Sequence, residues 1–233
     1  SLIYVLWLYG SMAVIGLACF PFALVNARAA NAAARAWSRA ALWGARVICG
    51  LRVEIRGREH VPEGAALIAA KHQAMLDTIM PFALLPDPTV VLKKELLVLP
   101  VFGWFSLRAG MIAIDREAGA TALRKMLREA RAHAGAGRQI VIFPEGTRQE
   151  VGAAPDYQPG VAALYRDLNL PCVPVALNTG LYWPAHGVRR KPGVAVIEFL
   201  APIPPGLSRH DFMEKLQEAI ETESDRLAKA GAA

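Results

Sequence analysis

Two side chains in the segment AAKHQAMLD are suited to moving a proton. His72 directly follows a short apolar stretch, and Asp77 comes five residues later. A carboxylate bound to one imidazole nitrogen fixes the tautomer of the ring and makes the other nitrogen a better base. A turn between a strand and a helix would bring the two groups together, whereas straight helical spacing would not. The pair is therefore a candidate general base with its supporting carboxylate, although histidines near aspartates also occur as purely structural pairs.

A second polar segment follows another apolar stretch, in QIVIFPEGTR. Gly146, which follows Glu145, permits a tight turn or the close approach of a ligand. Thr147 and the backbone amides can donate hydrogen bonds, and the guanidinium of Arg148 forms a fork that matches two phosphate oxygens. The segment is thus a candidate phosphate-binding loop, and the alternative is an ordinary turn.

Further cations lie at the ends of two other apolar stretches. Arg116 follows Asp115 after the stretch GMIAI, and Lys93 and Lys94 follow the stretch VVL. Arg116 offers a second cation for a phosphate, but an Asp–Arg pair on the surface would contribute little to stability. Lysines in such positions are normally solvated, so both interpretations stay open for Lys93 as well.

Strands and helices must position these residues. The hydrophobic pattern from residue 51 onward predicts such strands and helices. Short apolar segments alternate there with segments of helical periodicity. The expected strands are Leu51–Arg56, Ala66–Ala70, Thr89–Leu92, Met111–Ile114, Gln139–Phe143, Cys172–Ala176 and Val194–Leu200. The expected helices are Asp77–Leu85, Gly119–His133, Val161–Leu168 and Asp211–Lys229. This alternation predicts an α/β fold with a mainly parallel central sheet flanked by helices, and sites in such sheets gather at the carboxyl ends of the strands.

The chain starts with an uncharged apolar segment. Residues 1–27 carry no charge, and a helix from Leu2 to Val25 would be roughly 36 Å long, enough for a hydrocarbon core of about 30 Å. A signal peptide is the alternative, but its apolar stretch is shorter and follows basic residues. We therefore expect a retained N-terminal helical membrane anchor.

The segment after the anchor is rich in alanine and carries arginines on one side. On a helix Trp37 lies opposite four arginines that share nearly one direction, namely Arg28, Arg35, Arg39 and Arg46. Such an amphipathic helix suits the surface of an anionic bilayer, and the alternative is a solvated face packed on the domain. Arginines next to an apolar helix also indicate its cytoplasmic side. We expect a membrane-anchoring part over residues 1–50 and a cytoplasmic α/β domain over residues 51–233.

The composition excludes several classes of protein. With 54% hydrophobic and 20% charged residues, the 233-residue chain is unlike a disordered one. Its three cysteines are far apart, and no other histidine stands at ligand spacing from His72, so we expect neither a disulfide framework nor a metal site. Residues 1–53 hold five arginines and no acidic residue, which accounts for nearly all of the net charge of +6. We expect no nucleic-acid partner for the nearly neutral remainder.

Four blocks, taken in order, resemble the glycerolipid acyltransferase family, and most closely its bacterial 1-acyl-sn-glycerol-3-phosphate acyltransferases. The H-x4-D block of the family matches HQAMLD, its I-D-R block matches GMIAIDR, and its F-P-E-G-T-R block matches residues 143–148. Its apolar V-P block matches the segment from Val173 to Val175. The matches cover residues from about 65 to 180, and FPEGTR is highly specific when it follows H-x4-D at this separation.

The resemblance implies transfer of a fatty acyl group from acyl-CoA or acyl-acyl carrier protein to the sn-2 hydroxyl of lysophosphatidic acid, which gives phosphatidic acid. By this resemblance His72 is the general base and Asp77 orients it. Residues that match family positions associated with the acceptor phosphate or its pocket are Lys93, Arg116, Glu145, Gly146, Thr147 and Arg148. No G-x-S-x-G segment is present, so no covalent acyl-enzyme is expected. The resemblance implies no metal or redox cofactor.

The same resemblance implies a place at the bacterial inner membrane, with the catalytic domain on the cytoplasmic side. It also suggests that the N-terminal helices enter one leaflet rather than cross, which the sequence alone leaves open. The partners implied are the lipid bilayer, lysophosphatidic acid and the acyl donor.

Three positions depart from the family pattern. Lys71 replaces the usual asparagine before the histidine, and Ala74 replaces a serine; we expect catalysis to survive both. Ala113 replaces an aromatic residue, which leaves room for a different acceptor such as a lyso-ornithine lipid or another lysophospholipid. The alternative from another class is a catalytically silent, lipid-binding membrane scaffold, which an intact His72 and Asp77 disfavour.

Overall fold

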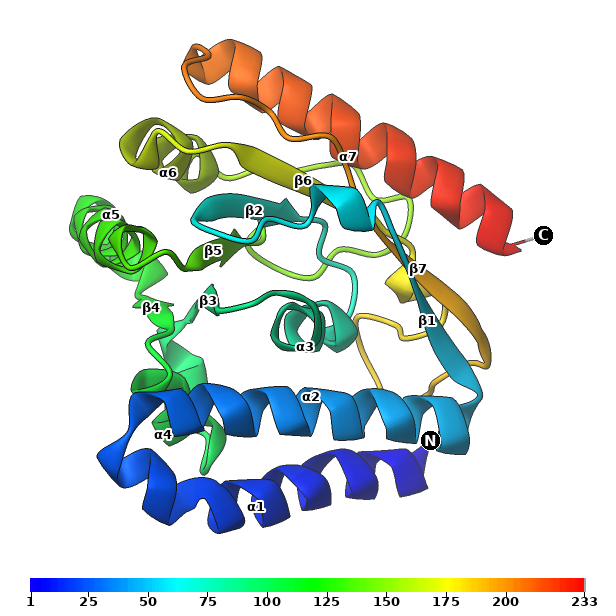
Figure 1. Cartoon of the computed structure of the whole chain (residues 1–233). Coiled ribbons are helices and arrows are strands. Elements are labelled where there is room, and N and C mark those ends of the chain that lie inside the picture. Colours follow the sequence, from blue (N-terminus) through cyan, green and yellow to red (C-terminus); the bar gives the residue numbers. More distant parts are fainter. Residues whose placement is uncertain (233) are drawn as a thin grey trace.

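A seven-stranded sheet runs through the middle of the molecule (Figure 1). The structure is a computed structural model that describes residues 1–232, with the side chains of Arg116 and Ala232 excepted. The strands are β1 (Leu51–Arg56), β2 (Ala66–Ala70), β3 (Pro88–Lys93), β4 (Ile112–Ile114), β5 (Gln139–Ile142), β6 (Cys172–Leu177) and β7 (Gly193–Phe199).

Seven α-helices and four short 3-10 helices are found in the described part of the chain. The α-helices are α1 (Leu2–Val25), α2 (Ala27–Cys49), α3 (Met75–Leu84), α4 (Phe102–Arg108), α5 (Gly119–Gly135), α6 (Gly160–Leu168) and α7 (Arg209–Ala232). The 3-10 helices are η1 (Arg58–His60), η2 (Lys94–Val98), η3 (Arg116–Ala118) and η4 (Thr179–Leu181).

Five of the strands run in one direction. The strand order is β1-β7-β6-β2-β5-β3-β4, and every neighbouring pair from β6 to β4 is parallel. Strand β7 pairs with β6 in the antiparallel sense, and β1 runs parallel to β7. The prediction of a mainly parallel sheet is confirmed. The carboxyl ends of β6, β2, β5, β3 and β4 therefore meet at one edge of the sheet.

Helices cover both faces of the sheet, which explains why β2 reads ALIAA and is buried along its whole length. Successive side chains of a strand point to opposite faces. Ile68 packs into the core that includes α1, α2 and α3, and Leu67 packs into the core beneath α5, α6 and α7. Figure 1 shows these two groups of helices on opposite sides of the sheet.

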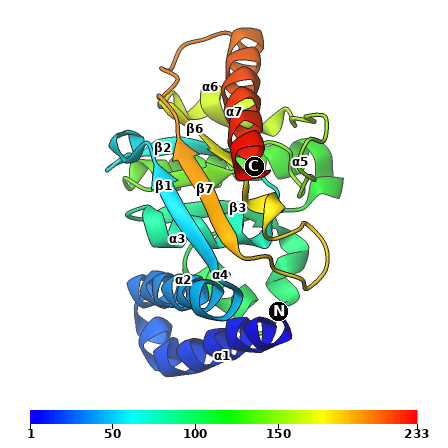
Figure 2. The same cartoon turned by 90° about the vertical axis from the view of Figure 1, so that its right-hand side faces the viewer.

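The first two helices form an antiparallel pair that lies across the base of the molecule (Figures 1 and 2). Asn26 is extended between them and caps α2 by accepting a hydrogen bond from the amide of Arg28 at 2.9 Å. The hydroxyl of Tyr4 donates to the carbonyl of Ala41 at 3.1 Å, and the indole of Trp37 donates to the carbonyl of Leu8 at 3.0 Å. These bonds join α2 to α1, and α2 also packs against α3 and β1 of the domain.

The ends of most elements lie within three residues of the expected bounds, and two further differences have a clear physical cause. Helix α3 begins at Met75 rather than Asp77, because the carboxylate of Asp77 accepts from the amide of Ala74 at 2.7 Å and so caps the helix from within its first turn. Helix α4 was not expected. It follows a tight turn in which Val101 has a φ of 64° and the amide of Phe102 donates to the carbonyl of Pro100 at 2.7 Å.

Candidate active site

His72 lies in the turn between β2 and α3, at the carboxyl edge of the sheet. Its Nδ1 is 3.2 Å from Oδ2 of Asp77, which is the third residue of α3. The strand-to-helix turn thus brings the two side chains together as expected. Asp77 is fully buried, whereas the imidazole is 12% exposed. A buried carboxylate on Nδ1 keeps the proton on that nitrogen and leaves Nε2 as the basic one.

Four donors hold the carboxylate of Asp77. Its Oδ2 accepts from the amide of Gln73 at 2.6 Å and from the amide of Ala74 at 2.7 Å, in addition to the imidazole. Its Oδ1 accepts from the hydroxyl of Thr179 at 2.6 Å. A buried carboxylate is tolerated only when its lone pairs are satisfied in this way. Asp77 therefore has a single well-defined position.

The ring of His72 is held on one side by an aromatic neighbour. Phe143, at the end of β5, stacks on the imidazole with ring centroids 4.3 Å apart and an angle of 27° between the planes. Among the described residues, none forms a hydrogen bond with Nε2 of His72. The basic nitrogen is therefore free to accept a proton from a substrate.

Glu145 is buried and faces the backbone of the His72 loop. Its Oε2 accepts from the amide of His72 at 2.9 Å, and its Oε1 forms an ion pair with Nζ of Lys71 at 2.6 Å. Burial raises the pKa of Glu145 above its ordinary value, although Lys71 acts in the opposite direction. Burial lowers the pKa of Lys71, but its hydrogen bonds to Glu145 and Glu221 outweigh this effect and raise the pKa. Glu145 thus contacts the loop of the base and not the solvent.

The rest of the FPEGTR segment turns outward. Gly146 has a φ of 68°, a conformation that favours glycine, and its amide donates to the carbonyl of Phe143 at 2.9 Å. Thr147 and Arg148 are exposed. Arg148 donates from Nη1 to the carbonyl of Ala185 at 2.8 Å, which anchors the guanidinium while the residue stays accessible.

The remaining candidate cations lie at the ends of neighbouring strands. Lys93 is the last residue of β3 and is exposed. Lys94 forms an ion pair with Asp115, which follows β4, so Lys94 is not a free cation. Arg116 begins η3, and its side chain lies outside the described residues. Topology therefore brings Lys93 to the same sheet edge as His72 and Arg148.

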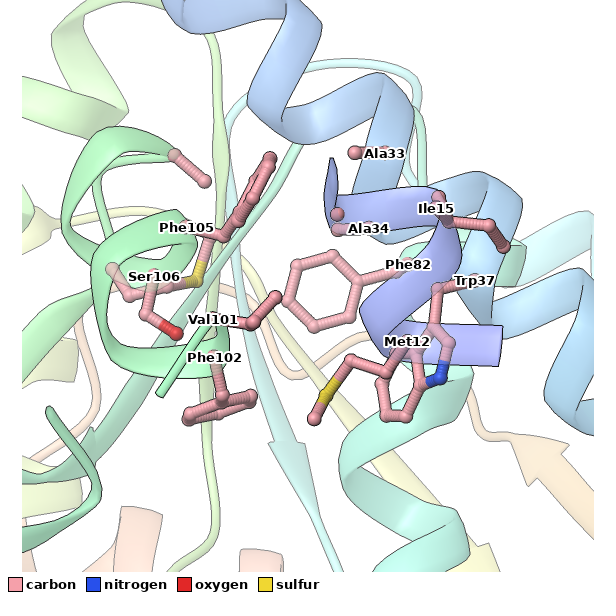
Figure 3. Close-up of a pocket in the computed structure, with 13 residues that line it drawn as sticks. Met12, Ile15, Ala33, Ala34, Trp37, Phe82, Val101, Phe102, Phe105 and Ser106 are labelled. Carbon is pink, nitrogen blue, oxygen red and sulfur yellow. The ribbon is translucent and has the colours of Figure 1, made fainter. Parts of the chain in front are cut away.

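Two apolar pockets lie near these elements. One is enclosed by α1, α2, α3 and α4, and Figure 3 shows side chains such as Met12, Trp37, Phe82 and Phe105 around it. The other lies between the sheet and α3, and its lining is apolar except for Asp77. Side chains of this kind suit a hydrocarbon chain.

Sequence reasoning missed two residues that touch this site. Thr179 comes two residues after the end of β6, in the segment LNTG. Because β6 neighbours β2, the position of Thr179 after a strand was the signal that could have placed it at the same sheet edge. Lys71 was noted only as a departure from a family pattern. Nothing in the sequence indicated its partner Glu221, because that residue is 150 positions away in the helix α7.

Comparison with known proteins places the chain among acyltransferases. Residues 52–178 match a family model described as Acyltransferase. The chain is 39% identical over 157 residues to a 1-acyl-sn-glycerol-3-phosphate acyltransferase of Pseudomonas aeruginosa, which is 67% of this chain and 61% of that protein. It is 28% identical over 192 residues to a protein of the same name from Cocos nucifera, covering 82% of this chain and 61% of that protein. The chain thus spans 61% of the length of either relative.

A solved structure has the same fold over almost the whole chain. The crystal structure of the 1-acyl-sn-glycerophosphate acyltransferase PlsC from Thermotoga maritima matches with a TM-score of 0.80 and 18% sequence identity. The match covers 97% of this chain and 95% of that one. The sheet and the N-terminal helix pair therefore form one shared architecture.

Proposed function

The chain belongs to the acyltransferase family, and from this premise we propose that it transfers a fatty acyl group from a thioester to the sn-2 hydroxyl of lysophosphatidic acid. The product is phosphatidic acid, and the donor is acyl-CoA or acyl-acyl carrier protein. The observation that carries the proposal is the pair of His72 and Asp77, 3.2 Å apart at the carboxyl edge of the sheet, with Nε2 of His72 open to a substrate.

The reaction proceeds by general base catalysis. Nε2 of His72 accepts the hydroxyl proton as the alcohol oxygen attacks the thioester carbon; the new C–O bond forms and the C–S bond breaks. The thiolate leaves and takes this proton from the imidazolium of His72, which regenerates the neutral imidazole. Asp77 stabilises the imidazolium through Nδ1, and catalysis of this kind contributes about 10²- to 10⁴-fold. The scheme needs no covalent acyl-enzyme and no metal or redox cofactor.

The acceptor phosphate binds to cations at the same edge of the sheet. Arg148 is exposed and anchored on Ala185, and Lys93 is exposed at the end of β3. A guanidinium and an ammonium together complement the two negative charges of a phosphate monoester. Arg116 is a third candidate by its position after β4. Thr147 and the turn at Gly146 shape this pocket, and Glu145 contributes by holding the loop.

The acyl chain binds in an apolar pocket. The pocket of Figure 3 is bounded by α1, a long apolar helix with many exposed apolar side chains. A fatty chain in such a pocket is removed from water, which favours binding by about 0.8 kcal/mol for each methylene group buried.

The protein acts at a membrane, and α1 is the element that binds the bilayer. It is long and apolar enough to span, with only 17% of its most apolar stretch buried. However, α1 packs side by side with α2, so a spanning α1 would carry the exposed arginines Arg39 and Arg46 into the hydrocarbon. We therefore place α1 in one leaflet, with these arginines at the level of anionic headgroups. The domain then faces the cytoplasm at the inner membrane.

The experiment that tests this function is an assay of thiol release from acyl-CoA, and from acyl-acyl carrier protein, with the protein in vesicles and a panel of lysolipid acceptors. We expect release that depends on lysophosphatidic acid. Release with a lyso-ornithine lipid or another lysophospholipid in its place would reassign the acceptor. No release with any acceptor and either donor would favour a silent lipid-binding scaffold.

A further inference from the structure

A partly buried ionic cluster lies next to the loop of His72, and we call it the Lys71 cluster. It consists of Lys71, Glu145, Glu221 and Tyr157. Nζ of Lys71 is 2.6 Å from Oε1 of Glu145 and 2.7 Å from Oε2 of Glu221. The hydroxyl of Tyr157 donates to Oε1 of Glu221 at 2.7 Å. Only 4% of the Lys71 side chain is exposed.

The cluster joins three distant parts of the chain. Lys71 directly precedes His72, and Glu145 and Tyr157 belong to the segment between β5 and α6. Glu221 comes from the middle of α7, which lies on the side of the sheet opposite α1 and α2 in Figure 1 and packs against β6. Helix α7 is therefore connected to the loop of the catalytic base by direct ionic contacts.

Stability does not explain such a cluster. Taking an ammonium and two carboxylates out of water costs more than their attraction returns in many proteins, and apolar side chains of similar volume often serve as well. What such a cluster does provide is a fixed geometry. All four members have partners here: the ammonium donates hydrogen bonds to Glu221 and forms an ion pair with Glu145, and the phenol donates to Glu221.

The geometry fixed in this way is that of the His72 backbone. Oε2 of Glu145 accepts from the His72 amide at 2.9 Å, while its Oε1 is bound by Lys71. Lys71 in turn is held by Glu221. Removing Glu221 would leave Lys71 with one carboxylate and free it to shift, and Glu145 would lose its fixed partner. The imidazole would then deviate from the position in which Nε2 faces the substrate.

We propose that Lys71 and Glu221 are positioning residues, which act through Glu145 to hold the backbone of His72 in its catalytic place. This inference rests on the proposed general-base role of His72. It predicts that variants of Lys71 and Glu221 lose turnover rather than substrate binding, because neither side chain lies among the exposed cations of the acceptor site.

The first test compares the kinetics of Glu221→Leu with those of Glu218→Leu. Glu218 is exposed on the same helix, three residues earlier, so its variant is a matched control. We expect Glu221→Leu to lower kcat by about 10- to 100-fold with both KM values within about twofold of the original. Glu221→Gln keeps acceptors for Lys71 and Tyr157 and should recover part of kcat. Glu218→Leu should leave kcat unchanged.

Two further variants separate positioning from stability. Ile220→Val lowers the unfolding temperature at a fully buried position beside Glu221 without touching the cluster, and we expect its kcat to be unchanged. The double variant Lys71→Met/Glu221→Leu should lose no more kcat than the worse single variant, because both act through one contact. A double variant whose loss of kcat equals the combined losses of the two single variants would contradict the proposal. So would a loss of kcat that correlates with the lowering of the unfolding temperature in all variants.

A measurement without turnover distinguishes this inference from the proposed function. Hydrogen exchange of the His72 amide, which donates to Glu145, should be faster in Lys71→Met and Glu221→Leu than in the original chain and Glu218→Leu. If exchange accelerates but the original chain transfers no acyl group, the cluster holds the loop and the assigned reaction is wrong. Unchanged exchange in both variants overturns the positioning role, whatever the activity.

Discussion

At the scale of single residues, the site depends on how tightly Asp77 is held. Its two oxygens accept four hydrogen bonds, three of them within the loop of residues 72–74 and one from Thr179 on the neighbouring strand end. The hydroxyl of Thr179 is the contact that comes from outside this loop. Because the carboxylate sets the tautomer of His72, its orientation matters for the rate as well as for stability.

The first prediction concerns Thr179. Thr179→Val keeps the shape of the side chain but removes the donor to Oδ1 of Asp77, which leaves a buried carboxylate oxygen unpaired. We expect a free energy of unfolding lower by about 1–3 kcal/mol and a kcat lower by about 10-fold. Thr179→Ser retains the hydroxyl and should restore most of kcat. Steady-state kinetics of the two variants check this, and equal kcat values for Thr179→Val and the original chain would refute it.

The second prediction concerns the acceptor phosphate. Arg148→Ala removes an exposed guanidinium at the carboxyl edge of the sheet. We expect the KM for lysophosphatidic acid to rise by about 10-fold or more, with a smaller change in the KM for the acyl donor. Arg124→Ala, at an exposed position on α5, is the control and should change neither. A rise confined to the donor KM would count against phosphate binding by Arg148.

Residue types predicted the contact between His72 and Asp77 but not everything around it. His72 and Asp77 are close in sequence, so a single turn determines their contact, and the structure shows that contact at 3.2 Å. Thr179 and Glu221 reach the site only through the order of strands and the path of α7. Residues that are so far apart in the sequence form no local motif, so their contacts could not be predicted from spacing. The expectation that catalysis tolerates Lys71 also took no account of its two carboxylate partners.

At the scale of elements, glycines allow the N-terminal helices to pack closely. A Cβ atom at Gly44 would lie 2.2 Å from Cδ1 of Trp7, whereas a Cβ atom at Gly10 would meet nothing within 4 Å. The indole of Trp7 also donates to the carbonyl of Ala40 at 2.9 Å and lies 5.0 Å from the ring of Trp43. The contact between α1 and α2 thus depends on the absence of a side chain at residue 44.

The third prediction follows from this contact. Gly44→Ala should displace Trp7 and lower the free energy of unfolding by about 1–3 kcal/mol, as overpacking does in a close-packed interior. Gly10→Ala lies on the open side of α1 and should be neutral or slightly stabilising. Thermal unfolding with tryptophan fluorescence measures both effects. Equal unfolding temperatures for the two variants would show that α1 is not packed on α2 as described.

Regular elements were predictable from their periodicity, and irregular ones were not. Strands β1 and β2 have the predicted bounds. Each of the other strands differs from its predicted bounds by one residue, at one end or at both ends. Helix α4 has seven residues, is apolar on most sides and begins after the unusual backbone of Val101, so it shows no helical period. Within α5, Ala122 faces the core, whereas the larger Leu123 is 37% exposed.

At the scale of the whole molecule, apolar surface is concentrated at one end. Large apolar side chains of α1 are exposed, among them Val14 at 67% and Leu17 at 72%. Val98, which ends η2, is 81% exposed, and α4 binds the end of α1 through Arg108, which donates to the carbonyls of Ala23 and Leu24. A surface of this extent is typical of membrane contact.

The fourth prediction tests that surface. Val14→Glu and Leu17→Glu combined place two carboxylates on the exposed side of α1 and should reduce binding to anionic vesicles by at least about 100-fold, since each charge in hydrocarbon costs about 3 kcal/mol. Vesicle flotation measures the effect. Leu123→Glu, at another exposed leucine on α5, should bind like the original chain. If the double variant still floats normally, α1 is not the element that enters the bilayer.

The distribution of charge agrees with the same orientation. The excess of positive charge lies in residues 1–53, and Arg39 and Arg46 are exposed on α2, next to the apolar α1. In the proposed reaction, the edge of the sheet that carries His72 receives a lipid acceptor from the bilayer and a soluble donor. A domain held at the membrane surface by α1 would have access to both of these proposed substrates.

The fifth prediction concerns Nε2 of His72, which we propose as the base of the acyl transfer. Thiol release from the acyl donor is followed with lysophosphatidic acid in vesicles, for the original chain and for His72→Ala. We predict that His72→Ala lowers kcat by at least about 100-fold while vesicle binding and the unfolding temperature stay nearly unchanged. A His72→Ala variant that is folded, bound to vesicles and nearly as active as the original chain would contradict the account.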